Sequence, residues 1–304
     1  MKNSIFFFLL TAVLASYAVC QEKSVIPLKV ENNRTLVTVS IGNVVIPNIL
    51  LDTGCTFDGL LIYNPDYKDS LDLADAQEID IHGAGSGGAS KALVIDPAVL
   101  SLGDIKISNQ KILVLQSGTF KGFPSNGVIG YSIFGHYVTE LNYDNHTMTL
   151  HKTDKINMGE SWTGIPLYFK DNNIPWIDVS VVIKEEKPMS LSSYIDSAGG
   201  DTIVLLEKPH MKFQLPKETV DAYIGRGLNG DIYGKAGNIS KLIIGPYELN
   251  DVKASFASAE VRSKQDNADA ILGNGSLRRF NLIFDYANKK LYLKPNAHFK
   301  DPFN

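Results

Sequence analysis

The chain has 304 residues and a net charge of −4, which allows two domains and gives no basic surface for nucleic acid. Its two cysteines are too few for a disulfide framework. Composition therefore excludes a basic nucleic-acid-binding protein and a small disulfide-stabilised domain.

The first 20 residues have the pattern of a signal peptide. Lys2 gives a short positive region, an apolar stretch runs from Ser4 to Leu14, and small residues precede a cleavage position after Cys20. This stretch is shorter than the roughly 20 apolar residues of a transmembrane helix. The sequence predicts an exported protein, periplasmic or secreted. Lipid attachment through Cys20 is less favoured, because the three preceding residues poorly match those before a lipidated cysteine.

The rest of the chain is one pattern repeated at an offset of roughly 140 residues. Any one match is weak, but shared order at near-constant spacing is hard to produce by chance. The repeat predicts an N-terminal lobe at residues 21–156 and a C-terminal lobe at residues 157–304. The matched segments are Ile26-Pro27-Leu28 with Ile165-Pro166-Leu167, Asp52 with Asp196, Gly83–Gly88 with Gly225–Gly230, Val128-Ile129-Gly130 with Ile271-Leu272-Gly273, and Leu141–Leu150 with Phe284–Leu293.

Strands are expected where Val, Ile and aromatic residues concentrate between Gly, Asn, Asp and Pro. Such stretches include residues 36–41, 179–183, 242–244 and 281–284. Each copy is expected to end in a hairpin, with turns at residues 143–146 and 286–289. Short helices are expected at residues 132–136 and 216–224. The sequence predicts an all-β protein of two similar lobes.

Two glycine-rich stretches fit the pattern G-x-G-x-x-G. A dinucleotide site requires a helix after such a stretch, whereas strand-like residues follow both stretches here. Nucleotide binding is therefore rejected in favour of two mobile β-hairpins with slim tips, and plain surface hairpins are the alternative. The glycines are Gly83, Gly85 and Gly88 in the first copy and Gly225, Gly227 and Gly230 in the second.

Asp52 and Asp196 occupy equivalent places in the two copies. Each follows an apolar run, which indicates a buried strand, and each begins a sequence of small residues that favours a tight turn. If a pseudo-twofold axis relates the lobes, the two carboxyls meet at it and share one proton, because close like charges cannot both ionise easily. Such a pair supplies a general base and a general acid. Paired carboxylates also cleave glycosides or bind metals, but those sites do not require symmetric lobes.

Other reactive side chains form no comparable constellation. The six histidines are scattered without metal-ligand spacing, so no metal site is predicted. Cys55 is predicted to be a small buried side chain and not a nucleophile, because no histidine lies in a matching motif.

The sequence resembles the aspartic proteases, specifically the pepsin-like enzymes built of two retropepsin-like halves. Leu51-Asp52-Thr53-Gly54, Ile195-Asp196-Ser197, the two apolar-apolar-Gly triplets and the closing segment Phe280–Leu293 carry the resemblance. It implies the acid protease fold, with two β-barrel lobes related by a pseudo-twofold axis and an active-site cleft between them. It also implies a monomeric endopeptidase that acts on peptides or proteins without a cofactor, nucleotide or nucleic acid.

The resemblance also implies roles for individual residues. Asp52 and Asp196 would bind the hydrolytic water, Thr53 and Ser197 would brace the two turns together, and the glycine hairpins would be flaps over an extended peptide. Gly54 and Ala198 complete the turns. The family usually has glycine where Ala198 stands, and a positive φ would strain an alanine there. The alternative is a catalytically weak or inactive peptide- or protein-binding module on this fold.

Overall fold

The computed structural model describes residues 23–82, 88–118, 120–152, 156, 158–170, 173–184, 187–206, 215–228, 230–257 and 268–303. The predicted signal peptide lies outside these residues. The described residues are mostly in β-strands, which form three sheets. None of the helices in this part of the chain is long and apolar enough to cross a membrane. The helices described are η1 (Pro65–Ser70), α1 (Tyr131–Phe134) and α3 (Asn274–Leu277).

One eight-stranded sheet is built from the first half of the chain, in the order β2-β3-β4-β9-β5-β8-β7-β6. An additional pairing of β3 with β7 turns the sheet into a nearly closed ring. Its strands are β2 (Lys29–Glu31), β3 (Arg34–Ile41), β4 (Val44–Leu51), β5 (Gly59–Ile62), β6 (Gln77–Ile81), β7 (Ser90–Leu102), β8 (Ile105–Leu115) and β9 (Gly127–Ile129).

A second eight-stranded sheet repeats this arrangement in the order β13-β14-β15-β20-β16-β19-β18-β17, with β14 also paired to β18. The two parallel pairings, β15 with β20 and β16 with β19, match β4 with β9 and β5 with β8. Two similar, nearly closed sheets are consistent with two β lobes, here called the first and second lobe. The strands are β13 (Tyr168–Phe169), β14 (Pro175–Val182), β15 (Met189–Asp196), β16 (Ile203–Leu206), β17 (Val220–Gly227), β18 (Gly230–Ile244), β19 (Tyr247–Ala257) and β20 (Ala270–Gly273).

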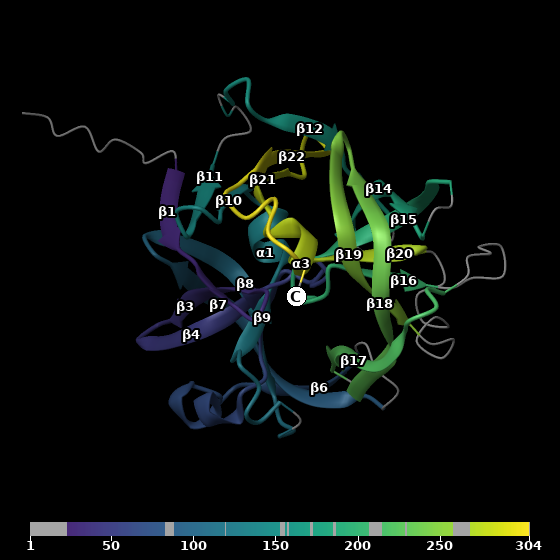
Figure 1. Ribbon diagram of the computed structural model, residues 1–304. Helices are drawn as coiled ribbons and strands as arrows, with labels where there is room; N and C mark the ends of the chain where they lie inside the picture. The colour runs from purple at the N-terminus through teal and green to yellow at the C-terminus, as the bar shows by residue number, and fades with distance from the viewer. Residues whose placement is uncertain are drawn as a thin grey trace, which may run out of the picture.

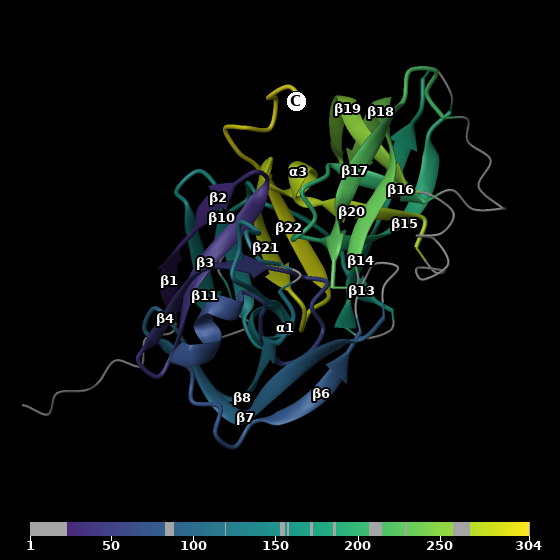
Figure 2. The ribbon, with the colours of Figure 1, turned by 90° about the horizontal axis from the view of Figure 1, so that it is seen from below.

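A third, six-stranded sheet takes strands from both halves in the order β1-β11-β10-β21-β22-β12. The expected closing hairpins are its β10–β11 and β21–β22 pairs, and β10 pairs with β21 across the halves. Figure 1 shows the strands of this sheet in the upper part of the molecule, above the blue strands of the first lobe and to the left of the green strands of the second. Figure 2 shows its yellow strands β21 and β22 in the view turned by 90°. Its strands are β1 (Lys23–Pro27), β10 (Val138–Asn142), β11 (Thr147–His151), β12 (Thr163–Pro166), β21 (Phe280–Asp285) and β22 (Lys290–Pro295).

Burial explains which segments became central strands. All residues of β5 and β16 are buried, so both strands are short continuous apolar runs, Gly-Leu-Leu-Ile and Ile-Val-Leu-Leu. The outer strand β1 alternates exposed and buried residues instead. One continuous core runs through all three sheets, with Phe134 and Phe284 fully buried at the centre.

The helix expected at residues 216–224 is wrong. Residues from Val220 onward form β17, which pairs antiparallel with β18 from Val220 opposite Ala236 to Gly227 opposite Gly230. The long partner strand satisfies the backbone hydrogen bonds of this segment, and that tertiary pairing overrides local helix preference. The helix expected at residues 132–136 corresponds to α1.

Candidate active site

Asp52 lies immediately after β4, where the chain leaves the first sheet. Its backbone N–H donates to the Ile129 carbonyl of β9 at 2.9 Å, which continues the parallel β4–β9 pairing by one residue. The carboxylate Oδ1 accepts a hydrogen bond from the Gly54 N–H at 2.7 Å. The Asp-Thr-Gly turn therefore holds the carboxyl group by its own backbone, at the end of a buried strand.

Asp196 is the last residue of β15, the strand that corresponds to β4. Its Oδ1 accepts hydrogen bonds from the backbone N–H groups of Ala198 at 3.0 Å and Gly199 at 2.8 Å. Ala198 is not among the residues with positive φ. An alanine therefore fits this turn without backbone strain, and it keeps the N–H donor that the carboxylate uses.

Thr53 and Ser197 join the two turns by reciprocal hydrogen bonds. The Thr53 N–H donates to Ser197 Oγ at 3.0 Å, and the Ser197 N–H donates to Thr53 Oγ1 at 3.1 Å. Each hydroxyl also donates across the lobes, Thr53 Oγ1 to the Ile195 carbonyl at 2.7 Å and Ser197 Oγ to the Leu51 carbonyl at 2.9 Å. Both side chains are buried, so the four bonds fix the distance between the turns.

The two apolar-apolar-Gly triplets pack against these turns, and each ends in a glycine that has no room for a side chain. A Cβ on Gly130 would lie 2.1 Å from the Asp52 carbonyl oxygen and 2.4 Å from that of Cys55. A Cβ on Gly273 would lie 2.2 Å from the Asp201 carbonyl oxygen. Glycine is required at both positions because the neighbouring atoms are backbone and cannot rotate away.

Burial makes both carboxyls weak acids. Burial first, and then the charge on Asp196, raise the pKa of Asp52 to about 8. Burial also raises the pKa of Asp196, and the backbone N–H groups of Gly199 and Ala198 oppose this shift. The two side chains nevertheless keep some contact with solvent. Asp52 consequently keeps its proton at pH values where an exposed carboxyl is ionised.

Burial and the charge of Asp52 also raise the pKa values of three nearby side chains, Cys55, Tyr63 and Tyr194. Burial, and then the charge on Asp52, raise the pKa of the Cys55 thiol well above its usual range, so the thiol stays protonated and is a poor nucleophile. Burial is also the main cause that raises the pKa of Tyr63 to about 12. Burial and the charges of both Asp residues raise the pKa of Tyr194 well above its usual range.

The four described glycines of the two G-x-G-x-x-G stretches lie in or near paired strands, not before helices. Gly225, Gly227 and Gly230 belong to the β17–β18 hairpin, and Gly230 has a φ of 128°, which favours glycine. Gly88 lies two residues before β7, and nothing lies within 4 Å of a Cβ placed on it. Gly83 and Gly85 lie outside the described residues. Figure 1 shows β6 and β17 on the same side of the molecule.

The β17–β18 hairpin crosses to the first lobe, which the sequence did not predict. Leu228 at its tip packs against a cluster that includes buried Tyr63 and Phe120 of the first lobe. Tyr63, Phe120 and Phe123 contact one another, with ring centroids 4.5 to 6.0 Å apart, and are here called the aromatic cluster. Only the position of Leu228 between two hairpin glycines hinted at such a contact.

A second link between the halves was also missed. The buried Asn274, which follows the Gly273 triplet, donates to the Asn33 carbonyl at 2.7 Å and to Thr35 Oγ1 at 3.1 Å. The Tyr143 hydroxyl donates to Asn274 Oδ1 at 3.0 Å. Tyr143 begins the turn of the repeated β10–β11 hairpin, so the repeat marked this turn but gave no indication of the partner of Tyr143.

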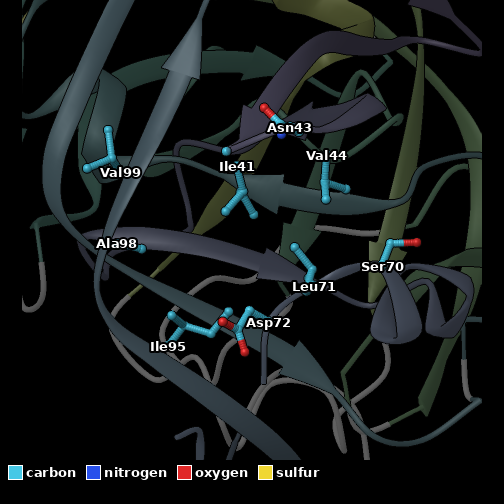
Figure 3. Close-up of a pocket in the computed structure, with 10 residues that line it drawn as sticks. Ile41, Asn43, Val44, Ser70, Leu71, Asp72, Ile95, Ala98 and Val99 are labelled. Atoms are coloured by element: carbon cyan, nitrogen blue, oxygen red, sulfur yellow. The ribbon is translucent and has the colours of Figure 1, made fainter. Parts of the chain in front are cut away.

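One pocket of about 400 Å³ lies elsewhere in the first lobe. Figure 3 shows Ile41 and Val44 of the β3–β4 hairpin, Leu71 after η1, and Ile95 and Val99 of β7 around it. None of the predicted site residues lines it. Among the described residues, no three His, Cys, Asp or Glu side chains gather as metal ligands would.

Comparison with known proteins adds no assignment. No model of a known protein family matches the chain, and no curated protein matches it. The two carboxyls and their supporting turns are therefore the features from which a function is inferred.

Proposed function

We propose that this protein is a pepsin-like aspartic endopeptidase in which Asp52 and Asp196 form the catalytic dyad. The observation that carries the proposal is the reciprocal bonding of Thr53 and Ser197, which joins equivalent turns of two sheets with the same strand order. In this proposal a pseudo-twofold axis relates the lobes, the molecule has the acid protease fold, and the substrate cleft runs between the lobes.

The shared proton provides the chemistry of peptide hydrolysis. The ionised carboxyl removes a proton from a water molecule, which attacks the peptide carbonyl carbon, while the protonated carboxyl donates its proton to the carbonyl oxygen. The resulting tetrahedral intermediate breaks at the C–N bond when the departing amine takes a proton from the dyad. The raised pKa values of Asp52 and Asp196 support a pair in which one carboxyl is the general base and the other the general acid.

The backbone of the second turn favours an active enzyme over a binding module. Ala198 has the conformation and the N–H donor that the turn needs, so its departure from glycine removes no hydrogen bond to Asp196. The signal-peptide pattern of residues 1–20 supports export, and two lobes in one chain support action as a monomer on peptides or proteins.

Digestion of a peptide library from about pH 3 to about pH 7 tests the proposal. The wild-type protein is expected to cleave peptides, and Asp52→Asn and Asp196→Asn are expected to lose cleavage while remaining folded. Unchanged turnover in either variant contradicts the dyad. Measurable peptide binding by a folded but wholly inactive wild-type protein would favour the binding module instead.

A further inference from the structure

Arg34 is a cation at the junction of the lobes that the proposed dyad chemistry does not use. It is the first residue of β3, and both of its neighbours are fixed to the second lobe. The Asn33 side chain donates to the Gly200 carbonyl, four residues after Asp196, at 2.9 Å. Thr35 accepts from Asn274. The position of Arg34 relative to the Asp196 turn is therefore fixed on both sides.

The Arg34 side chain packs against the aromatic cluster. Its guanidinium carbon lies 5.2 Å from the centroid of the Phe123 ring, which itself contacts Tyr63 and Phe120. Leu228 of the β17–β18 hairpin packs, from the second lobe, against the hydrophobic cluster that includes Tyr63 and Phe120. Arg34 thus lies where the first lobe meets the hairpin, and it is only half-buried.

The charge of Arg34 is not neutralised by any carboxylate in the described part of the chain. Glu31, directly opposite Arg34 in the β2–β3 pairing, forms an ion pair with Lys29 at 2.7 Å. Asp231 of the β17–β18 hairpin is paired with Arg226. Among described residues Arg34 has no ion pair of its own. Its charge nevertheless reaches both lobes, since it opposes the raised pKa values of Tyr63 and Tyr223.

A guanidinium that packs on a ring keeps its in-plane N–H donors for a ligand. Those donors match a carboxylate, which accepts two parallel hydrogen bonds from them. We propose that Arg34 binds an acidic side chain of the substrate, so that the protein selects peptides with Asp or Glu near the cleaved bond. This inference rests on the proposed function, because it assigns the substrate of the same site.

The test uses decapeptides with an apolar central pair, amidated at the C-terminus, in which Glu or Gln is placed at each flanking position. At about pH 6, where Glu is ionised, wild-type kcat/KM is expected to be about tenfold higher for Glu than for Gln at one position. Arg34→Gln is expected to abolish that preference by slowing the Glu peptide alone. Arg34→Lys keeps the positive charge but lacks the planar guanidinium, so it is expected to retain part of the preference for Glu. Lys106→Gln, an exposed cation on β8, is the matched control and leaves the ratio unchanged.

Binding of the same peptides to Asp52→Asn, measured by calorimetry, separates the two proposals. If the wild type cleaves nothing but binding of the Glu peptide still depends on Arg34, the protease function fails and the carboxylate site stands. Cleavage with equal rates for Glu and Gln overturns the carboxylate site, and so does a Glu preference that survives Arg34→Gln. The Gln peptides are also made without the C-terminal amide. An Arg34-dependent preference for these free C-termini over an internal Glu assigns the carboxylate to a chain end and overturns the side-chain proposal.

Discussion

The backbone N–H of Thr53 donates to the hydroxyl of Ser197, and the backbone N–H of Ser197 donates to the hydroxyl of Thr53, at 3.0 and 3.1 Å. Each residue is thus both donor and acceptor for its equivalent in the other lobe. Because the hydroxyls are buried, neither can exchange its partner for water. The relative position of Asp52 and Asp196 depends on these two side chains.

Thr53→Val is expected to destabilise the protein by about 2–4 kcal/mol, although it preserves side-chain volume. It removes the hydroxyl that accepts from the Ser197 N–H and donates to the Ile195 carbonyl, and leaves both groups buried without partners. Thr53→Ser keeps the hydroxyl and is expected to destabilise the protein less than Thr53→Val does. Urea unfolding measures the difference. Thr38→Val on the exposed side of β3 is the control, and equal effects of the two valine substitutions would contradict the brace.

Asp52→Asn is expected to be more stable than the wild type near pH 7 but not near pH 4. The folded pKa of Asp52, about 8, lies above its unfolded value near 4. The folded wild type therefore binds a proton that the unfolded chain releases, so its stability falls as pH rises from about 4 to about 8. Asparagine does not titrate. The free energy of unfolding of Asp52→Asn relative to the wild type should therefore grow between about pH 4 and about pH 8, to at least about 1 kcal/mol.

Unfolding by urea at a series of pH values measures this growth. Asp80→Asn on β6 is the control for removal of a carboxyl that is not buried, because Asp80 is exposed. A stability difference for Asp52→Asn that stays constant from about pH 4 to about pH 8 would show that the dyad is neither desolvated nor coupled.

Local sequence was sufficient for the features that repeat. The matched order of apolar runs, turns and glycines predicted two similar β lobes and placed Asp52 and Asp196 at the ends of corresponding strands. A turn is specified by three or four neighbouring residues, and a buried strand by its own apolar run, so both are visible without knowledge of their partners.

Features that depend on distant partners were not predictable in this way. Residues 220–227 form a strand because β18 pairs with them, and nothing within the segment shows that partner. The pairing of β10 with β21 and the packing of Leu228 on the first lobe are likewise contacts between halves. The repeat describes each half by itself. The meeting of Asp52 and Asp196 followed from an assumed twofold axis, and the brace of Thr53 and Ser197 from the family resemblance.

Gly130→Ala is expected to cost about 3 kcal/mol or more and to displace the Asp52 turn, because its Cβ would overlap two backbone carbonyl oxygens. Gly118→Ala is the matched control, since nothing lies within 4 Å of a Cβ there and Gly118 is not among the glycines with positive φ. Thermal unfolding compares the two, with little change or a small gain expected for Gly118→Ala. Similar stability of both variants would mean that the triplet does not pack directly against the turn.

Leu228→Ser is expected to accelerate amide hydrogen exchange along β17. Leu228 is the apolar side chain at the hairpin tip that contacts the first lobe, and without it the hairpin loses this contact while Ile224 still packs on the second lobe. Loss of that contact lowers the free energy of local opening while the core strands stay protected. The control is Val220→Ser on the same strand, because Val220 is 68% exposed and contributes little packing. Exchange measured by mass spectrometry should rise several-fold in Ile224–Gly227 for Leu228→Ser alone, and equal exchange in both variants would show that the hairpin is not anchored through Leu228.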